Sequence, residues 1–208
     1  SVMRGLVLSG AAISLYGDSR PASGAEHHMS HYWETILEQR GIRPAMHGEQ
    51  VAVGTVLVLM LIEELLKENI DFDAARESAR AYNSAAWELE IRAHYGAAAD
   101  EVIALEQKAG KNNIKGRLAR IDSMQRSWDA VRAQLETLPE SSSVRALLRD
   151  IGCPCTPSDI GVDDELLMDT FRYCKEIRAR YTVFQTVYDL GLTDKLAARV
   201  IEKANCAD

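Results

Sequence analysis

The stretch that decides the fold is SGAEHHMSHYWETILEQRGIRPAMHGEQVAVGTVLVLMLI, residues 23–62. It opens with a capping signal, in which Ser23 is the expected N-cap of a helix and Glu26 its N3 residue. A second and very apolar helix is expected from about His47 to Glu68. Residues 41–46 (GIRPAM) join the two, and connections of this length are typical of antiparallel helices that pack side by side.

The rest of the chain continues this helical character. No stretch of useful length alternates apolar and polar residues as a half-buried strand does, and no repeat is visible. We therefore predict an all-α fold of roughly eight to ten helices in one domain, residues 1–208. The expected helices are residues 2–16, 23–39, 47–68, 71–93, 97–109, 114–137, 141–151, 163–179, 182–190 and 193–204.

Composition excludes several functional classes. The 208 residues are 47% hydrophobic, which is enough for a substantial core. The net charge of -7 argues against nucleic acid or an anionic membrane as the main partner. The most apolar run, Val51–Ile62, is shorter than the roughly 20 residues that span a bilayer, so no membrane insertion is expected.

Cellular location is inferred by elimination. Residues 1–16 lack the cationic region and cleavage site of a signal peptide. The four cysteines, at positions 153, 155, 174 and 206, are too few and too poorly spaced for a disulfide framework or a zinc knuckle. A cytoplasmic protein with free thiols is the expectation.

Two local features give further expectations about packing. Gly54 lies inside the apolar helix, which suggests that another backbone approaches closely there. The lysines and arginines of residues 108–120 are interpreted as a solvated helix face.

Three histidines are the candidate functional residues. His27 and His31 are four residues apart, so they project from one face of their helix. His47 stands where the next helix begins. Imidazoles from two neighbouring helices can converge on a divalent metal. The alternative is that these histidines are polar residues satisfied at a helix interface.

At these residues the sequence resembles a known family. The run SRPASGAEHHMSH (19–31) and the motif HGEQ (47–50) resemble sn-glycerol-1-phosphate dehydrogenases, most closely the bacterial branch. This family belongs to the iron-type alcohol dehydrogenase and dehydroquinate synthase superfamily. Arg180-Tyr181-Thr182 is similar as well, though weakly specific.

The resemblance implies a fold and an activity. The family has an α/β domain that binds NAD or NADP and a helical domain that holds zinc or nickel through an aspartate and two histidines. The implied reaction reduces dihydroxyacetone phosphate to sn-glycerol 1-phosphate, in a homodimer or larger homo-oligomer. Nearly all of this chain resembles the helical domain, and nothing in it resembles the nucleotide-binding domain.

The resemblance also assigns residues to roles. His27 and His47 take the two metal-binding positions, and His31 lines the active site as a catalytic and substrate-binding residue. Arg20 precedes a helix N-terminus, so we expect it to bind the substrate phosphate. His28 is rotated by about 100° from His27 on a helix and should point elsewhere. Glu26 and Glu49 are expected to cap helices rather than to coordinate a metal.

The family's metal-binding aspartate has no counterpart in this chain. The third ligand is thus predicted to lie upstream of Ser1, and the chain alone is expected to bind metal weakly and to be inactive. Two alternatives remain open: the helical domain of a related glycerol dehydrogenase or dehydroquinate synthase-like enzyme, or a non-catalytic helical module for oligomerisation or metal binding.

Overall fold

The computed structural model describes residues 2–205 and is built from helices alone in that range. The α-helices are α1 Val2–Tyr16, α2 Ala25–Gln39, α3 His47–Leu66, α4 Phe72–Arg80, α5 Ser84–Tyr95, α6 Ala99–Ala109, α7 Ile114–Leu135, α8 Ser141–Asp150, α9 Asp164–Tyr173, α10 Val183–Asp189 and α11 Thr193–Asn205. Four 3₁₀ turns, η1 Arg20–Ala22, η2 Gly96–Ala98, η3 Ser158–Ile160 and η4 Cys174–Glu176, connect some of them. The all-α prediction is confirmed.

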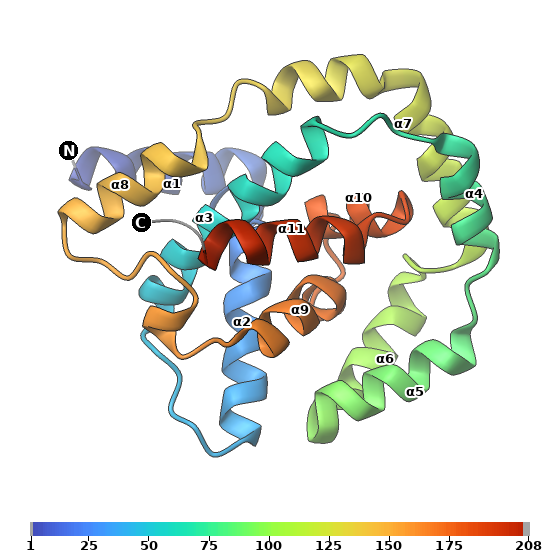
Figure 1. The fold of residues 1–208 in the computed structure, drawn as a ribbon, viewed down its shortest axis with the longest axis horizontal. Coiled ribbons are helices and arrows are strands. Elements are labelled where there is room, and N and C mark those ends of the chain that lie inside the picture. Colours follow the sequence, from blue (N-terminus) through green and yellow to red (C-terminus); the bar gives the residue numbers. More distant parts are fainter. Residues whose placement is uncertain (1, 206–208) are drawn as a thin grey trace.

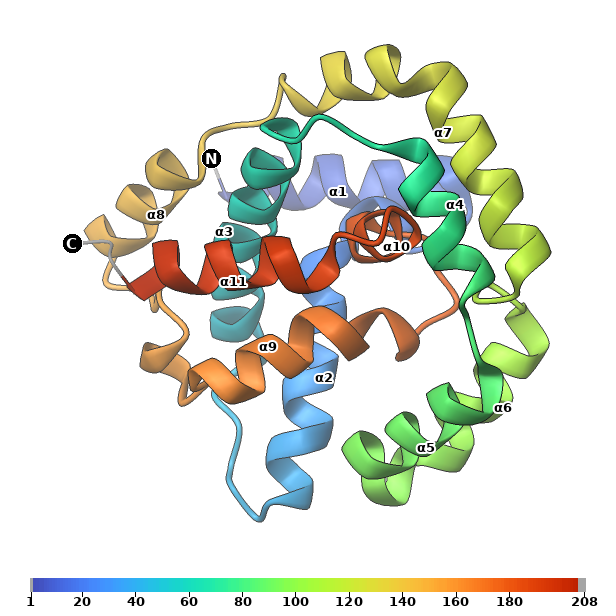
Figure 2. The ribbon, with the colours of Figure 1, turned by 45° about the vertical axis from the view of Figure 1, so that its right-hand side comes forward.

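The core is built around the pair α2 and α3. Figures 1 and 2 show α9, α10 and α11 between the side formed by α4–α7 and the side that carries α8. Met29 and Trp33 of α2 and Leu57, Leu61 and Leu65 of α3 are fully enclosed. The Trp33 indole nitrogen donates to Thr170 Oγ1 at 2.8 Å, which satisfies the polar atom of this large core side chain.

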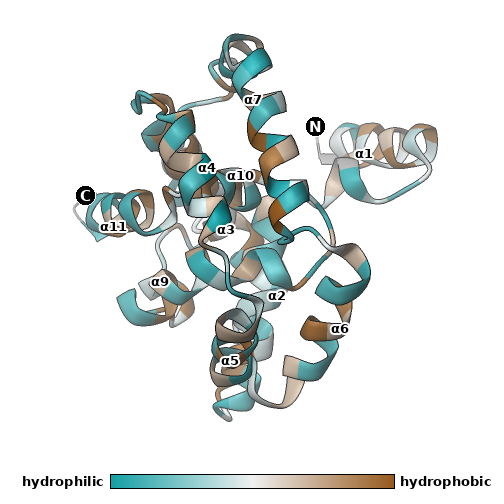
Figure 3. Cartoon of the chain, turned by 90° about the vertical axis from the view of Figure 1, so that its right-hand side faces the viewer, coloured by the Kyte–Doolittle hydropathy of each residue, from teal (hydrophilic) through white to brown (hydrophobic). Residues whose placement is uncertain are grey.

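Helix α1 is placed differently from the others. It packs mainly against η1 and stands to one side of the molecule (Figure 3). Its apolar residues Met3, Leu6 and Leu8 are exposed. Across the part of the chain that is described, no helix combines the length and apolar character needed to cross a bilayer.

Two of the predicted helices are divided or shortened in the structure. The predicted helix 71–93 is two helices, because Asn83 interrupts it and caps α5 by accepting from the amides of Ala85 and Ala86. This break gives eleven α-helices among residues 2–205 rather than eight to ten. The predicted helix 163–179 ends at Tyr173 and tightens into η4.

The residue predicted to cap the start of α2 was wrong. Gly24, not Ser23, is the N-cap, because the Ser23 amide bonds to the Arg20 carbonyl within η1. Glu26 still caps the helix end, but from N2, with Oε1 accepting from the Gly24 amide at 2.8 Å. Glu49 caps α3 as predicted, since its carboxylate accepts from the Met46 amide at 3.0 Å.

The thiols of Cys153, Cys155 and Cys174 are free, as expected. Cys206 lies outside the described residues.

The close approach predicted at Gly54 is confirmed. A Cβ atom on Gly54 would lie 3.0 Å from the backbone oxygen of Glu26, so α3 meets α2 at the residue that precedes His27. A side chain at this position is disfavoured because the obstacle is backbone and not a flexible side chain.

We expect Gly54→Ala to lower the free energy of unfolding by about 1 kcal/mol, because the overpacking exceeds the gain in helix propensity. Gly48→Ala is the matched control in the same helix, since a Cβ there would meet nothing within 4 Å. That variant should be stabilised by up to about 1 kcal/mol. Urea unfolding of both measures the difference, and a stabilised Gly54→Ala protein would contradict the close approach.

Candidate functional site

Three histidines gather where α2 meets the start of α3. His27 and His31 project from one face of α2, and His47 is the first residue of α3. The ring centroid of His47 is 5.3 Å from that of His27 and 5.5 Å from that of His31, while His27 and His31 are 6.4 Å apart. The predicted convergence of the three side chains is confirmed; their chemical roles stay predictions.

Carboxylates hold the rings in place. Nδ1 of His27 is 2.8 Å from Glu26 Oε1. Nδ1 of His47 is 2.9 Å from Glu34 Oε1, and Nδ1 of His31 is 3.2 Å from Glu34 Oε2. An ionised carboxylate can only accept, so Nδ1 is the donor in each of these contacts. These contacts orient the three imidazole rings.

A buried pair of polar side chains also positions His47. The Ser30 hydroxyl donates to Gln50 Oε1 at 3.2 Å, and its oxygen lies 3.1 Å from His47 Nδ1. Gln50 in turn donates to the carbonyl of Ala45 at 2.7 Å. Because Ser30 and Gln50 are buried, they limit the rotation of the His47 ring.

Glu34 is the site residue that the sequence reasoning missed. One donor atom each from His31, Glu34 and His47 lies within 4.8 Å of the others. The signal was present in the sequence, since Glu34 follows His31 by three residues and so shares its helix face.

The protonation states suit a cation. Burial raises the pKa of Glu34, but hydrogen bonds from His47 and His31 outweigh it and leave that pKa below its ordinary value. Burial lowers the pKa of His31 in spite of its bond to Glu34. At neutral pH the Glu34 carboxylate is therefore ionised and lies beside a neutral His31 imidazole.

The donor set fits a divalent metal. Catalytic zinc sites commonly use three protein ligands drawn from histidine and carboxylate, with one position left open. Here His47 is common to two possible sets, one with His27 and one with His31 and Glu34. Glu26 contacts the ring of His27, and Ser30, which is bonded to Gln50, contacts the ring of His47.

Arg20 is the first residue of η1, the turn before α2. Its side chain is 57% exposed and pairs with Asp18 at 3.4 Å. Arg180 instead ties down the loop before α2, donating to the Ser23 carbonyl at 3.1 Å and to the Ser19 hydroxyl at 2.9 Å. The Arg-Tyr-Thr stretch noted in the sequence therefore has a structural link to the first motif.

His28 points away from the other histidines, as predicted. It is buried, and neither of its ring nitrogens has a partner among residues 2–205. Burial is the main cause that lowers its pKa to about 4, with Lys111, Arg180 and Arg178 adding to the effect. His28 is a neutral core residue.

Comparisons with known proteins agree on one kind of enzyme. A glycerol-1-phosphate dehydrogenase (NAD(P)+) of Halalkalibacterium halodurans is 26% identical over 178 residues, or 86% of this chain. The protein of the same name from Geobacillus stearothermophilus is 25% identical over 190 residues, or 91% of this chain. The chain is similar to glycerol-1-phosphate dehydrogenases.

The extent of the similarity differs between relatives. A glycerol-1-phosphate dehydrogenase of Methanosphaera stadtmanae is 50% identical, but over 60 residues, which are 29% of this chain and 16% of that protein. The chain spans 35% and 38% of the length of the two relatives described above, so it corresponds to a part of these dehydrogenases. No family model matches the chain. No solved structure matches it.

Proposed function

We propose that this chain forms the metal- and substrate-binding part of a glycerol-1-phosphate dehydrogenase that uses NAD or NADP. The observation that carries the proposal is the cluster of His27, His31 and His47 with Glu34, found in a chain similar to enzymes of that name. The nicotinamide cofactor would be bound elsewhere in the longer protein. Among the described residues there is no β-strand followed by a glycine-rich turn of the kind that binds nucleotides.

His27 and His47 are the proposed metal ligands. The resemblance implies a third ligand upstream of Ser1, but the position of Glu34 beside His47 leads us to propose instead that the third donor comes from this chain. His31 and Glu34 are the candidates, because both lie beside His47. A bound zinc or nickel ion would act as a Lewis acid toward the carbonyl oxygen of dihydroxyacetone phosphate. The Glu34 carboxylate offsets positive charge in the site and orients the rings of His31 and His47. Arg20 remains the proposed contact for the substrate phosphate.

Metal titration tests the proposal. We expect zinc to bind the chain with a dissociation constant near or below about 1 μM, because three donors are preorganised. His47→Ala should weaken binding about a hundredfold or more, since this residue belongs to both donor sets. His94→Ala is the matched control, as His94 pairs with Asp169 away from the cluster.

The variants His27→Ala, His31→Ala and Glu34→Gln identify the donor set. Loss of zinc binding in His27→Ala, and also in either His31→Ala or Glu34→Gln, supports a metal site completed within the chain. Wild-type binding weaker than about 1 mM would contradict it and return the third ligand to the remainder of the protein. In the zinc-loaded chain, dihydroxyacetone phosphate should bind more tightly than dihydroxyacetone, and equal binding would contradict recognition of the phosphate.

A further inference from the structure

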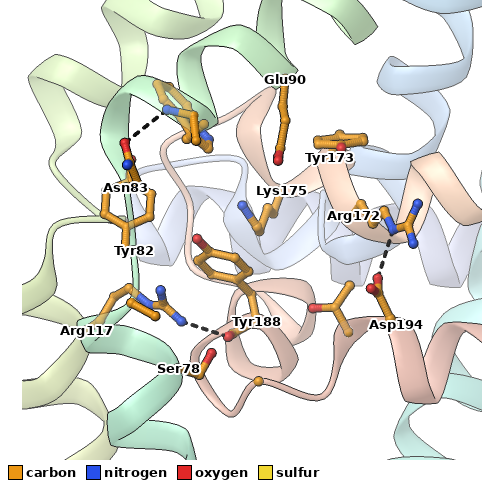
Figure 4. Close-up of a pocket in the computed structure, with 15 residues that line it drawn as sticks. Ser78, Tyr82, Asn83, Glu90, Arg117, Arg172, Tyr173, Lys175, Tyr188 and Asp194 are labelled. Carbon is orange, nitrogen blue, oxygen red and sulfur yellow. Dashed lines mark hydrogen bonds and ion pairs between the residues drawn. The ribbon is translucent and has the colours of Figure 1, made fainter.

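A cavity of about 630 Å³ lies between α4 and α5 on one side and η4, α10 and α11 on the other (Figure 4). None of its lining residues belongs to the histidine cluster. Its size is in the range that holds a small organic ligand. Its inner wall carries charge that the proposed dehydrogenase function does not use.

Two buried cations form that wall. Arg117 and Lys175 are 2% and 3% exposed, and both line the cavity. They lie against the same ring, with the Arg117 guanidinium carbon 4.1 Å and the Lys175 ammonium 3.9 Å from the centroid of Tyr188. Cations this deeply buried are costly unless anionic groups surround them.

Their protein partners leave donors unused. Arg117 donates through Nε to Asp189 at 3.3 Å and through Nη2 to the Tyr188 carbonyl at 3.0 Å. Within residues 2–205, Nη1 has no hydrogen-bond partner, and the ammonium of Lys175 bonds to Glu176 alone. A guanidinium offers five donors and an ammonium three, so both can accept a further anion.

The charge of the surrounding cluster also has one cation in excess. The cluster contains three carboxylates and four cations. The carboxylates are Glu106, Glu176 and Asp189, and the cations are Lys111, Arg117, Arg120 and Lys175. At the cavity rim Arg172 is neutralised by Asp194 at 2.8 Å. Glu90 also lines the cavity; it is an exposed residue, and Figure 4 shows its carboxylate turned into the cavity.

Aromatic rings supply the rest of the lining. Tyr82, Trp87 and Tyr173 border the cavity together with Tyr188. Burial raises the pKa of the Tyr82 and Tyr188 hydroxyls, so they stay protonated and can donate to an anion. Flat rings beside buried cations suit a ligand with a planar body and an anionic end.

We propose that this cavity is a binding site for a small planar organic anion, whose phosphate or carboxylate group contacts Arg117 and Lys175. The site stands on its own residues and does not depend on the proposed dehydrogenase function. Phenyl phosphate and benzoate share the recognised chemistry and differ in the anionic group. Benzyl alcohol is the neutral counterpart.

The test is calorimetric titration of the metal-free chain, with chelator present, against these three compounds. We expect phenyl phosphate or benzoate to bind with a dissociation constant below about 1 mM, and benzyl alcohol to bind at least about tenfold more weakly. The anion that binds more tightly shows whether the site prefers a phosphate or a carboxylate group. His47→Ala should leave this binding unchanged, which separates it from the metal site.

Two variants locate the site. Ala86 is an exposed lining residue on α5, so Ala86→Trp fills the cavity without removing a buried charge, and binding should fall at least about tenfold. Ala85 is exposed beside it and does not line the cavity, so Ala85→Trp is the matched control and should bind as the wild type does. Lys175→Gln, if folded, should bind about tenfold more weakly.

Absence of anion binding up to about 10 mM would overturn the proposal. Equal binding of benzyl alcohol, or unchanged binding in Ala86→Trp, would overturn it as well.

Discussion

Replacing Asp189 by alanine is expected to lower the free energy of unfolding by about 3–5 kcal/mol, the loss typical of breaking a buried ion pair. The Asp189 carboxylate is fully buried and accepts from two arginines, Arg117 and Arg120. It also accepts from Gln185 Nε2 at 3.1 Å. Removing it leaves the Arg117 guanidinium buried without its carboxylate, which is the costly state.

Denaturant unfolding measures this loss, with Asp194→Ala as the control. Asp194 forms an ion pair with Arg172 as well, but its side chain is 68% exposed, so the control should lose less than about 1 kcal/mol. Asp189→Asn keeps the shape of the side chain and provides a measurable variant if the alanine protein does not fold. A loss below about 1 kcal/mol in both Asp189 variants would show that the arginines find other partners.

Asp189 also illustrates what the sequence concealed. The basic residues of 108–120 were interpreted as a solvated face, and this was wrong for Lys111 and Arg117, which are buried. Lys111 pairs with Glu176 and Arg117 with Asp189, carboxylates more than 60 residues away in the chain. Charge pairing at such separation follows no local period, so helical spacing alone could not reveal it.

Local signals, in contrast, predicted the geometry of the histidine cluster well. The four-residue spacing of His27 and His31 and the short connection to His47 were enough to predict that the three rings converge. Gly54 correctly marked the close approach of α2 and α3. Both features depend only on the geometry of two neighbouring helices within residues 23–62.

The misplaced cap at Ser23 has a different origin. The pattern of serine followed by glutamate three residues later was present, but η1 takes the Ser23 amide and Arg180 takes its carbonyl. The contacts of Ser23 with η1 and with Arg180 thus moved the N-cap by one residue, to Gly24. The break at Asn83 was not predicted, although asparagine is a favoured capping residue.

Acid should destabilise the chain through His28. Its pKa falls from the ordinary 6.5 to about 4, first because the ring is buried and then because of Lys111, Arg180 and Arg178. Above pH 6.5 the ring is neutral in both the folded and the unfolded state, so it contributes no pH dependence. Below pH 6.5 the unfolded chain binds the proton first, and the free energy of unfolding decreases until the folded ring titrates near pH 4. The total loss attributable to His28 is about 3 kcal/mol across this window.

Urea unfolding at pH 7.5 and pH 5.0 measures the effect, compared between the wild type and His28→Leu. Leucine carries no proton, so the variant should lose about 2 kcal/mol less than the wild type between these two pH values, whatever its stability at pH 7.5. His94→Leu is the control, because His94 is half-buried and has Asp169 as a partner at 3.3 Å. If His28→Leu and the wild type lose equal stability on acidification, the ring of His28 takes up its proton in the folded state as readily as in the unfolded one, and the lowering of its pKa by burial and by Lys111, Arg178 and Arg180 is refuted.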